Sequence, residues 1–357
     1  MRTWTLLPMF ISFIGALTSP LMANTYRIAF GSCAKQDRPQ PVWSTIDQER
    51  PDVFLFIGDN VYADTQNPQL MEARYQQLAE IPEFKSFRAR VPMLATWDDH
   101  DYGANDAGAE FPMKAKAQEI FLDFFQVPQD SPRRQQEGIY YAETRNWQDK
   151  RIQFILLDTR YFRSPLQKGP GGYRPDLDPE ATLLGQAQWT WLEEQLRQPA
   201  DLRIIASSIQ FLAMDHRFEK WHNLPLERQK MLNIIARTGA EAVVFVSGDR
   251  HIGEISVLSD STVPYPIFDL TASGLTDPLS ADPVIELNHL RVPGTEAHTP
   301  QQYGLIELET LKSSEVRLTL SLKDGLGRTL ETVAMPLSRL TKPQNVRVHK
   351  ERSNFAG

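Results

Sequence analysis

Three short apolar stretches of the sequence each end in side chains that can bind a metal ion or carry a proton. Continuous apolar runs of this length are typical of strands that are buried on both faces in a parallel sheet. Ligands of open α/β sheets bind at the carboxyl ends of the strands, so we expect the side chains after these stretches to meet at one edge. The stretches are Val53–Ile57, Met93–Trp97 and Ala242–Val246, and the side chains that follow them are Asp59, Asn60, Tyr62, Asp98, Asp99, His100, Asp101, Asp249 and His251.

The end of the second stretch is unusually acidic. Asp98, Asp99, Asp101 and Asp106 fall within a window of nine residues. Carboxylates crowded at the end of a buried strand repel one another unless a cation offsets their charge. The spacing therefore favours a site that holds metal ions over a solvated turn after each strand.

The complete set of candidate ligands mixes hard and soft donors. Carboxylates suit calcium, magnesium or manganese, whereas a thiolate and a phenolate suit iron or zinc. Because both kinds are present, the sequence predicts a mixed site with two or more metal ions, with Asp59 as the natural bridge. Cys33, the single cysteine, ends a strand-like run that starts at Tyr26, although a small buried core residue is the alternative. The candidates are Cys33, Asp59, Tyr62, Asp98 or Asp99, Asn105, Asp249 and His251.

The chemistry that such ligands support is hydrolysis of a phosphate ester. Two metal ions can clamp the attacking and leaving oxygens while a metal-activated water attacks phosphorus in line. His100, beside the acidic cluster, could protonate the leaving alcohol. Arg160 also follows an apolar run, and its planar guanidinium suits the remaining phosphate oxygens; a solvent-facing arginine is the alternative.

The spacing of apolar residues predicts an α/β fold. Strands and amphipathic helices alternate early in the chain, which implies a mostly parallel sheet. Alternating apolar and polar residues in the last third indicate antiparallel strands. A glycine-rich stretch, Lys168–Tyr173, lacks the Gly-Lys-Ser/Thr ending of a phosphate-binding loop and is interpreted as a surface loop near the site. Helices are expected at Pro41–Arg50, 67–80, Phe111–Phe125, Gly185–Gln198 and Pro225–Thr238, and antiparallel strands at Glu254–Leu258, Pro266–Leu270, Tyr303–Glu309, Glu315–Leu322 and Thr329–Pro336.

Length and composition are those of an ordinary globular protein. The chain has 357 residues, of which 41% are hydrophobic and 23% charged, and its net charge of −7 argues against stable binding to nucleic acid. Residues 1–23 resemble a Sec-type signal peptide, with Arg2 before a short apolar run; an uncleaved anchor is the alternative. We therefore expect a periplasmic or secreted protein with no membrane span after cleavage, one domain at residues 24–340 and a polar tail at residues 341–357.

Five motifs in order resemble those of the alkaline phosphatase D (PhoD-like) family, within the metallophosphoesterase-like enzymes. Segments 208–211, 219–221 and 271–274 also fit, and the resemblance spans about residues 26–310. Larger members carry an N-terminal β-sandwich domain, which is not expected before Tyr26. The motifs are Gly31-Ser32-Cys33, Gly58-Asp59-Asn60-Val61-Tyr62, Trp97-Asp98-Asp99-His100-Asp101, Leu157-Asp158-Thr159-Arg160 and Ser247-Gly248-Asp249-Arg250-His251.

The resemblance implies a four-layer αββα sandwich and hydrolysis of phosphate monoesters and diesters outside the cytoplasm, with ferric iron and calcium as the metals. By resemblance, Cys33, Asp59 and Tyr62 match the iron-binding positions, and Asp249 with His251 matches the closing metal motif. General metallophosphoesterases carry an Asn-His pair where this chain has Asp99 and His100. That match supports a catalytic role for His100, and the choice of ligand among Asp98, Asp99 and Asn105 stays open.

Three functions are compatible with these sequence features. The first is an exported metal-dependent phosphatase or phosphodiesterase that hydrolyses small phosphate esters; manganese, magnesium or zinc could replace iron and calcium. The second is a phospholipase D-like or nucleic-acid phosphodiesterase. The third is a catalytically silent metal- or phosphate-binding protein, against which the joint presence of all the candidate ligands argues. The sequence does not fix the oligomeric state.

Overall fold

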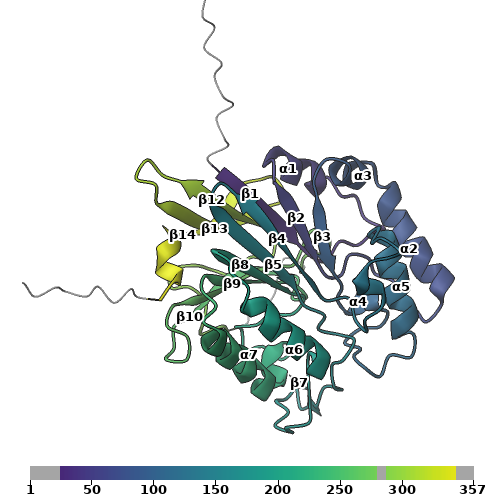
Figure 1. Cartoon of the computed structure of the whole chain (residues 1–357). Coiled ribbons are helices and arrows are strands. Elements are labelled where there is room, and N and C mark those ends of the chain that lie inside the picture. The colour runs from purple at the N-terminus through teal and green to yellow at the C-terminus, as the bar shows by residue number, and fades with distance from the viewer. Residues whose placement is uncertain (1–24, 280–286, 343–357) are drawn as a thin grey trace, which may run out of the picture.

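Two six-stranded sheets form the centre of the computed structural model, which describes residues 25–279 and 287–342 (Figure 1). The first sheet has the order β14-β13-β12-β1-β2-β3 and the second the order β10-β11-β9-β8-β5-β4. The strands of the first are β1 (Thr25–Gly31), β2 (Val53–Ile57), β3 (Met93–Thr96), β12 (Gln302–Thr310), β13 (Val316–Asp324) and β14 (Thr329–Pro336). Those of the second are β4 (Tyr141–Trp147), β5 (Lys150–Leu156), β8 (Leu202–Ser207), β9 (Val243–Ser247), β10 (Gly253–Leu258) and β11 (Ile267–Ala272).

Parallel strands lie side by side in both sheets, and their carboxyl ends carry the candidate ligands. Strands β1, β2 and β3 pair in parallel in the first sheet, and β5, β8, β9 and β11 do so in the second. Antiparallel strands extend each sheet outward: β12 to β14 beside β1, β4 beside β5, and β10 beside β11. This mixed pattern is common where a parallel core carries antiparallel edges.

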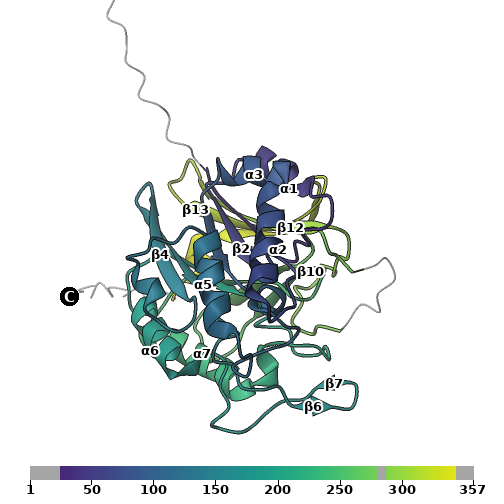
Figure 2. The same ribbon diagram turned by 90° about the vertical axis from the view of Figure 1, so that its right-hand side faces the viewer.

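Helices cover the outer face of each sheet, so the layers run helix, sheet, sheet, helix (Figures 1 and 2). The first sheet packs against α1, α2, α3 and α5, and the second against α6 and α7. The αββα sandwich is therefore confirmed. The helices are α1 (Val42–Gln48), α2 (Pro68–Glu80), α3 (Pro82–Arg88), α4 (Asp99–Tyr102), α5 (Lys114–Phe124), α6 (Gly185–Leu196) and α7 (Pro225–Thr238).

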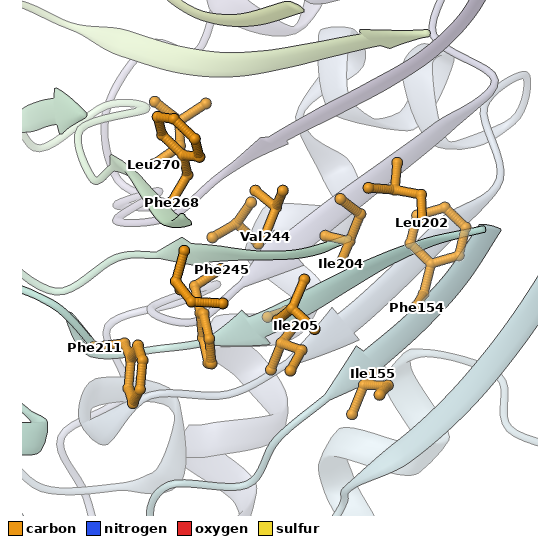
Figure 3. Packing of buried hydrophobic residues seen from close by; sticks show 14 of the residues in the cluster. Phe154, Ile155, Leu202, Ile204, Ile205, Phe211, Val244, Phe245, Phe268 and Leu270 are labelled. Carbon is orange, nitrogen blue, oxygen red and sulfur yellow. The ribbon is translucent and has the colours of Figure 1, made fainter. Parts of the chain in front are cut away.

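The side chains of β2 point alternately into two different apolar cores. Successive side chains of a strand point to opposite faces. Val53, Leu55 and Ile57 join the core between the sheets, whereas Phe54 and Phe56 join the core under the helices. The core between the sheets also includes residues of β5, β8, β9 and β11, which Figure 3 shows from close by. Because β2 is buried on both faces, its continuous apolar sequence is the one such a position requires.

Most elements lie where the sequence analysis places them. The expected cap at Asn67 is present, since its side chain accepts hydrogen bonds from the backbone N–H groups of Gln69 and Leu70. Helix α3, the short helix α4 and the hairpin of β6 (Lys168–Gly169) and β7 (Gly172–Tyr173) were not expected. The strand at Pro266–Leu270 was expected to be antiparallel; β11 pairs antiparallel with β10 but parallel with β9.

Two of the sequence predictions lie largely or wholly outside the described residues. The signal peptide at residues 1–23 precedes residue 25, and the tail at residues 341–357 continues beyond residue 342. Among the described residues, no helix is both long and apolar enough to cross a membrane.

Candidate active site

Candidate ligands that follow three strands meet at one cavity of about 870 Å³. The loop after β2 supplies Asp59, the loop after β3 supplies Asp99, and the loop after β9 supplies Asp249. These strands belong to both sheets, so the cavity lies where the carboxyl ends of the two parallel cores converge. Of the sequence candidates, the cavity wall includes Asp59, Asp99, His100, Asn105, Asp249 and His251.

Four overlapping groups of side chains in this region could each hold a metal ion, because the ligand atoms of each group lie within 4.8 Å of one another. Asp99 belongs to three of the groups and Asp59 to two, so either carboxylate could be shared between neighbouring metal ions. The groups are Cys33, Asp59 and His251; Asp59, Asp99 and His100; Asp98, Asp99 and Asp249; and Asp99, Asp106 and Glu219.

The soft donors lie together on one side of Asp59. The sulfur of Cys33 is 3.3 Å from Asp59 Oδ2, and Tyr62 Oη is 3.5 Å from His251 Nε2. His251 Nδ1 is occupied by the backbone carbonyl of Asp277, so Nε2 is the nitrogen left to face Tyr62. Burial raises the pKa of the Cys33 thiol to about 12, against the opposing effect of hydrogen bonds from Ser273 and Ser32. The thiol therefore needs a strong electrophile beside it to become a thiolate.

His100 is held by carboxylates on its ring and on its backbone. Its Nδ1 lies 2.7 Å from Asp64, and its backbone N–H donates to Asp99 at 2.8 Å. Burial lowers the pKa of the imidazole, but the hydrogen bond with Asp64 and the negative charge of Asp99 outweigh it and raise the pKa to about 9. With Nδ1 bound to Asp64, Nε2 is the ring nitrogen available to the cavity that His100 lines.

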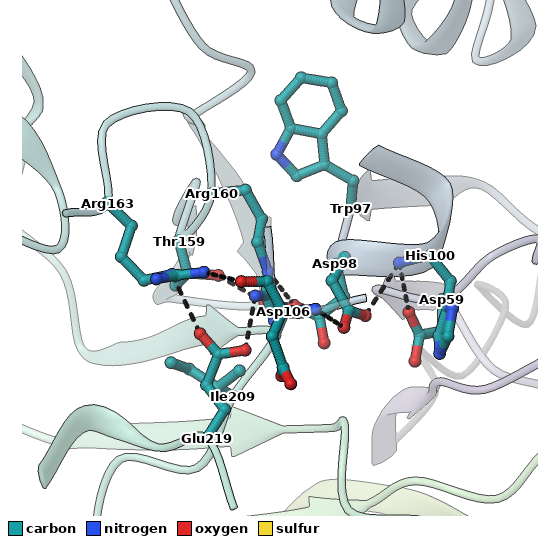
Figure 4. A network of polar contacts seen from close by, with 12 residues as sticks. Asp59, Trp97, Asp98, His100, Asp106, Thr159, Arg160, Arg163, Ile209 and Glu219 are labelled. Carbon is teal, nitrogen blue, oxygen red and sulfur yellow. Dashed lines mark hydrogen bonds and ion pairs between the residues drawn. The ribbon is translucent and has the colours of Figure 1, made fainter. Parts of the chain in front are cut away.

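Arg160 is not among the residues that line the cavity, so its expected role in holding phosphate oxygens gains no support from the cavity wall. Its guanidinium is fully buried and donates to Asp98 and, over 2.6 Å, to Glu219. Arg163 approaches the other oxygen of Glu219 at 3.0 Å, so the carboxylate lies between two arginines (Figure 4). Arg160 therefore positions Asp98 and Glu219, and each of its three guanidinium nitrogens already donates to a carboxylate.

Buried negative charge is the dominant electrostatic feature of the site. Burial, with the charges of Cys33 and Asp99, raises the pKa of Asp59 well above its usual value. Burial and the charge of Asp98 do the same for Asp249. The Oδ2 atoms of Asp98 and Asp249 are buried and have no hydrogen-bond partner among the described residues. Such acceptors are costly unless a cation binds them, so the donor set fits metal ions.

Four of the candidate ligands also have a backbone conformation that few residues other than glycine adopt. Cys33, Asp59, Asp249 and His251 have φ angles of 59°, 48°, 68° and 56°. Left-handed backbone costs roughly 1–2 kcal/mol for an ordinary residue and gathers at functional sites. The turn after each strand therefore bends back sharply and directs its side chain toward the shared edge.

Sequence reasoning left the choice among Asp98, Asp99 and Asn105 open, and the three lie differently. The two oxygens of Asp99 accept from the backbone N–H groups of His100, at 2.8 Å, and Asp106, at 2.7 Å. Asn105 lies exposed at the cavity wall, and its amide nitrogen donates to Asp106. Asp98 is bound to Arg160 through one oxygen, and its other oxygen is unpartnered.

Several residues of the site were missed because nothing local marks them. Asp64 binds His100, Glu219 anchors Arg160, and Ser273 lies 3.2 Å from the Cys33 sulfur. Each reaches its partner from a different loop. The one usable signal was proximity to a motif, since Asp64 follows Tyr62 by two residues and Ser273 lies within the segment 271–274.

An αββα sandwich with carboxylate, imidazole, phenol and thiol groups at one edge is the arrangement that the sequence resemblance to metallophosphoesterases implies. Comparison with known families gives a match to the PhoD-like phosphatase family over residues 28–282. The match covers more than half of the 357 residues, and the chain belongs to this family.

Two individual proteins illustrate the similarity. The chain is 23% identical over 266 residues to alkaline phosphatase D of Bacillus subtilis (strain 168), an alignment that covers 62% of this chain and 45% of that protein. The chain thus matches less than half the length of this relative. A solved structure of PhoD matches 90% of this chain and 73% of its own, with a TM-score of 0.70 and 18% identity, which supports the fold.

Proposed function

We propose that this protein is an exported, metal-dependent phosphoesterase that hydrolyses small phosphate esters. The observation that carries the proposal is the convergence of buried carboxylates at one cavity, two of them with an unpartnered oxygen. Membership of the PhoD-like phosphatase family and the name of the Bacillus subtilis relative support the reaction type.

The donor chemistry divides the site into a soft and a hard part. Cys33, Asp59 and Tyr62 would hold ferric iron, with His251 beside them, because thiolate and phenolate favour that ion. Asp99, Asp249 and either Asp98 or Asn105 would hold calcium, which prefers oxygen ligands. When bound, metal ions here supply positive charge to the phosphate oxygens and make water a stronger acid.

His100 would serve the leaving group. It lines the cavity beside Asp59 and Asp99, and Asp64 fixes Nδ1, so Nε2 is oriented to donate a hydrogen bond or a proton to an ester oxygen. Asp64 therefore acts as a positioning residue. Arg160 has no part in substrate binding in this proposal, because its donors are bound to Asp98 and Glu219.

The deciding experiment compares an aryl phosphate monoester with the matching diester, with iron and calcium supplied. Asp59→Ala removes the carboxylate shared by two ligand groups, so turnover should fall to the rate of the buffer alone while the circular dichroism spectrum is retained. Asp149→Ala, at an exposed ion pair with Lys150, is the matched control and should keep full activity. Near-normal turnover by Asp59→Ala would contradict the proposal.

The remaining outcomes separate the competing functions. Turnover of the diester alone would favour a phosphodiesterase acting on lipid or nucleic acid. No turnover with metals bound would favour a silent binding protein. A visible iron–phenolate absorption that disappears in Tyr62→Phe tests the ferric assignment without reference to activity, and zinc or calcium alone by elemental analysis would reject it. N-terminal sequencing of the protein from the periplasm or medium tests export and cleavage after Ala23.

A further inference from the structure

A second cavity, of about 390 Å³, lies next to the one that holds the candidate ligands. The two cavities share Arg217 and Phe218 on their walls. The other wall of the second cavity is the β6–β7 hairpin, which is the glycine-rich stretch Lys168–Tyr173. The catalytic scheme proposed above gives this hairpin no role.

The hairpin is fixed against both the loop that carries Arg217 and the site itself. The backbone N–H of Tyr173 donates to the Arg217 carbonyl at 2.9 Å, and its hydroxyl donates to Asp106 at 2.7 Å. Gly172 has a φ of 146°, and a Cβ there would lie 2.2 Å from the Arg217 carbonyl oxygen. A glycine is therefore required for the hairpin to come this close, and the second cavity has a defined wall.

Two cations face this cavity and have no carboxylate partner among the described residues. Lys168 and Arg217 are exposed, and neither forms an ion pair. The guanidinium of Arg217 lies 5.0 Å from the ring centroid of Phe218, which is 38% exposed. A guanidinium with free donors beside an ammonium group is a surface suited to phosphate oxygens.

We propose that the second cavity binds a second, non-reacting phosphate group of the substrate, so that the preferred substrates are small esters with two phosphate groups. The inference rests on the proposed function and names its substrate class. One phosphate lies at the metal ligands, the linking carbon chain passes over Phe218, and the far phosphate meets Lys168 and Arg217. Arg217 and Phe218 border both cavities, so a substrate that occupies both would cross these two side chains.

A pair of esters of equal length isolates the effect of the second charge. 3-Phosphonopropyl phosphate has one cleavable ester and one dianion that cannot be hydrolysed, whereas butyl phosphate has a methyl group in place of that dianion. We expect a higher kcat/KM for the phosphono ester, by roughly three- to five-fold for each cation at low salt, which is the size of an exposed ion pair. The preference should shrink as ionic strength rises.

Matched variants connect the preference to this cavity. Arg217→Gln and Lys168→Gln should each lower the ratio of kcat/KM for the phosphono ester to kcat/KM for butyl phosphate, and the double variant should bring this ratio to one. Arg174→Gln removes the same charge from an exposed residue that directly follows the hairpin and lines neither cavity, so it should leave the preference intact.

Equal kcat/KM values for the two esters in the wild type, or an unchanged preference in the double variant, would overturn the inference while the proposed function stands. Failure to cleave butyl phosphate at all would count against the proposed function instead. In that case binding of propane-1,3-diphosphonate by calorimetry replaces the ratio. Equal affinity of the wild type and Arg217→Gln would then reject the second phosphate site.

Discussion

Replacing Glu219 by glutamine tests whether the buried charge network holds the site together. The carboxylate of Glu219 is 1% exposed and lies between Arg160, at 2.6 Å, and Arg163, at 3.0 Å. Two arginines and the carboxylates of Asp98 and Glu219 make the group neutral. Glutamine keeps the shape of the side chain but leaves one buried positive charge without its partner.

The expected loss in the free energy of unfolding depends on the partners that each arginine keeps in the variant. Removing one partner of a buried ion pair costs about 3–5 kcal/mol. Arg160 keeps Asp98, and Arg163 keeps hydrogen bonds to the carbonyls of Ser164 and Asp106, so we place the loss at about 3 kcal/mol, the lower end. At about 2 °C per kcal/mol for a chain of this size, Tm should fall by roughly 6 °C.

Glu193→Gln is the matched control, because Glu193 also bridges two arginines, Arg197 and Arg237, but at the surface. Water screens that group, so its loss should leave Tm unchanged. Thermal and denaturant unfolding of the three metal-free proteins measure the difference. If Glu219→Gln lowers the free energy of unfolding by less than about 1 kcal/mol, as for a surface ion pair, then burial does not strengthen this network and the reasoning is refuted.

Two further predictions concern the loop and the hairpin beside the cavity. Burial and the charge of Arg250 lower the pKa of His216 from 6.5 to about 2, so the unfolded chain binds a proton below pH 6.5 that the folded protein does not. The contribution of His216 should therefore lower the free energy of unfolding by about 1.4 kcal/mol for each pH unit below 6.5. Urea unfolding at several pH values should show this dependence for the wild type but not for His216→Asn, and the same pH dependence in both proteins would contradict the prediction. Gly172→Ala should weaken the preference for the phosphono ester more than Gly171→Ala does. Both glycines have a positive φ, but a Cβ at Gly171 would meet no atom within 4 Å. Equal effects of the two substitutions in the kinetic assay would show that contact with Arg217 is not what holds the hairpin.

Apolar patterning predicted the layers and the edge at which the site lies, because burial on both faces dictates the sequence of a strand. Strand β2 is the clearest case, since all five of its residues are buried. The same pattern did not predict α3, which begins at Pro82, only two residues after the end of α2, with the proline in the first turn of the new helix.

The sequence pattern also did not predict which charged groups pair with one another. Four carboxylates in nine residues were interpreted together as candidate ligands, but two of them also bind other groups of the protein. Asp98 binds Arg160, and Asp101 accepts hydrogen bonds from the backbone N–H groups of Asp98 and Asn60. The partners of such groups come from distant loops, as Glu219 does for Arg160, so spacing along the chain contains no signal for them.

The residues at the edge of the sandwich that carries the site destabilise the folded chain, whereas its apolar cores stabilise it. Four left-handed residues and several buried carboxylates each raise the free energy of the folded chain at the same place. Two continuous apolar cores, with strands buried on both faces between them, supply the stability that lets this edge persist. Because cations would bind the folded form and offset the same carboxylates, the edge that weakens the metal-free chain is the part that gains most when the proposed metal ions bind.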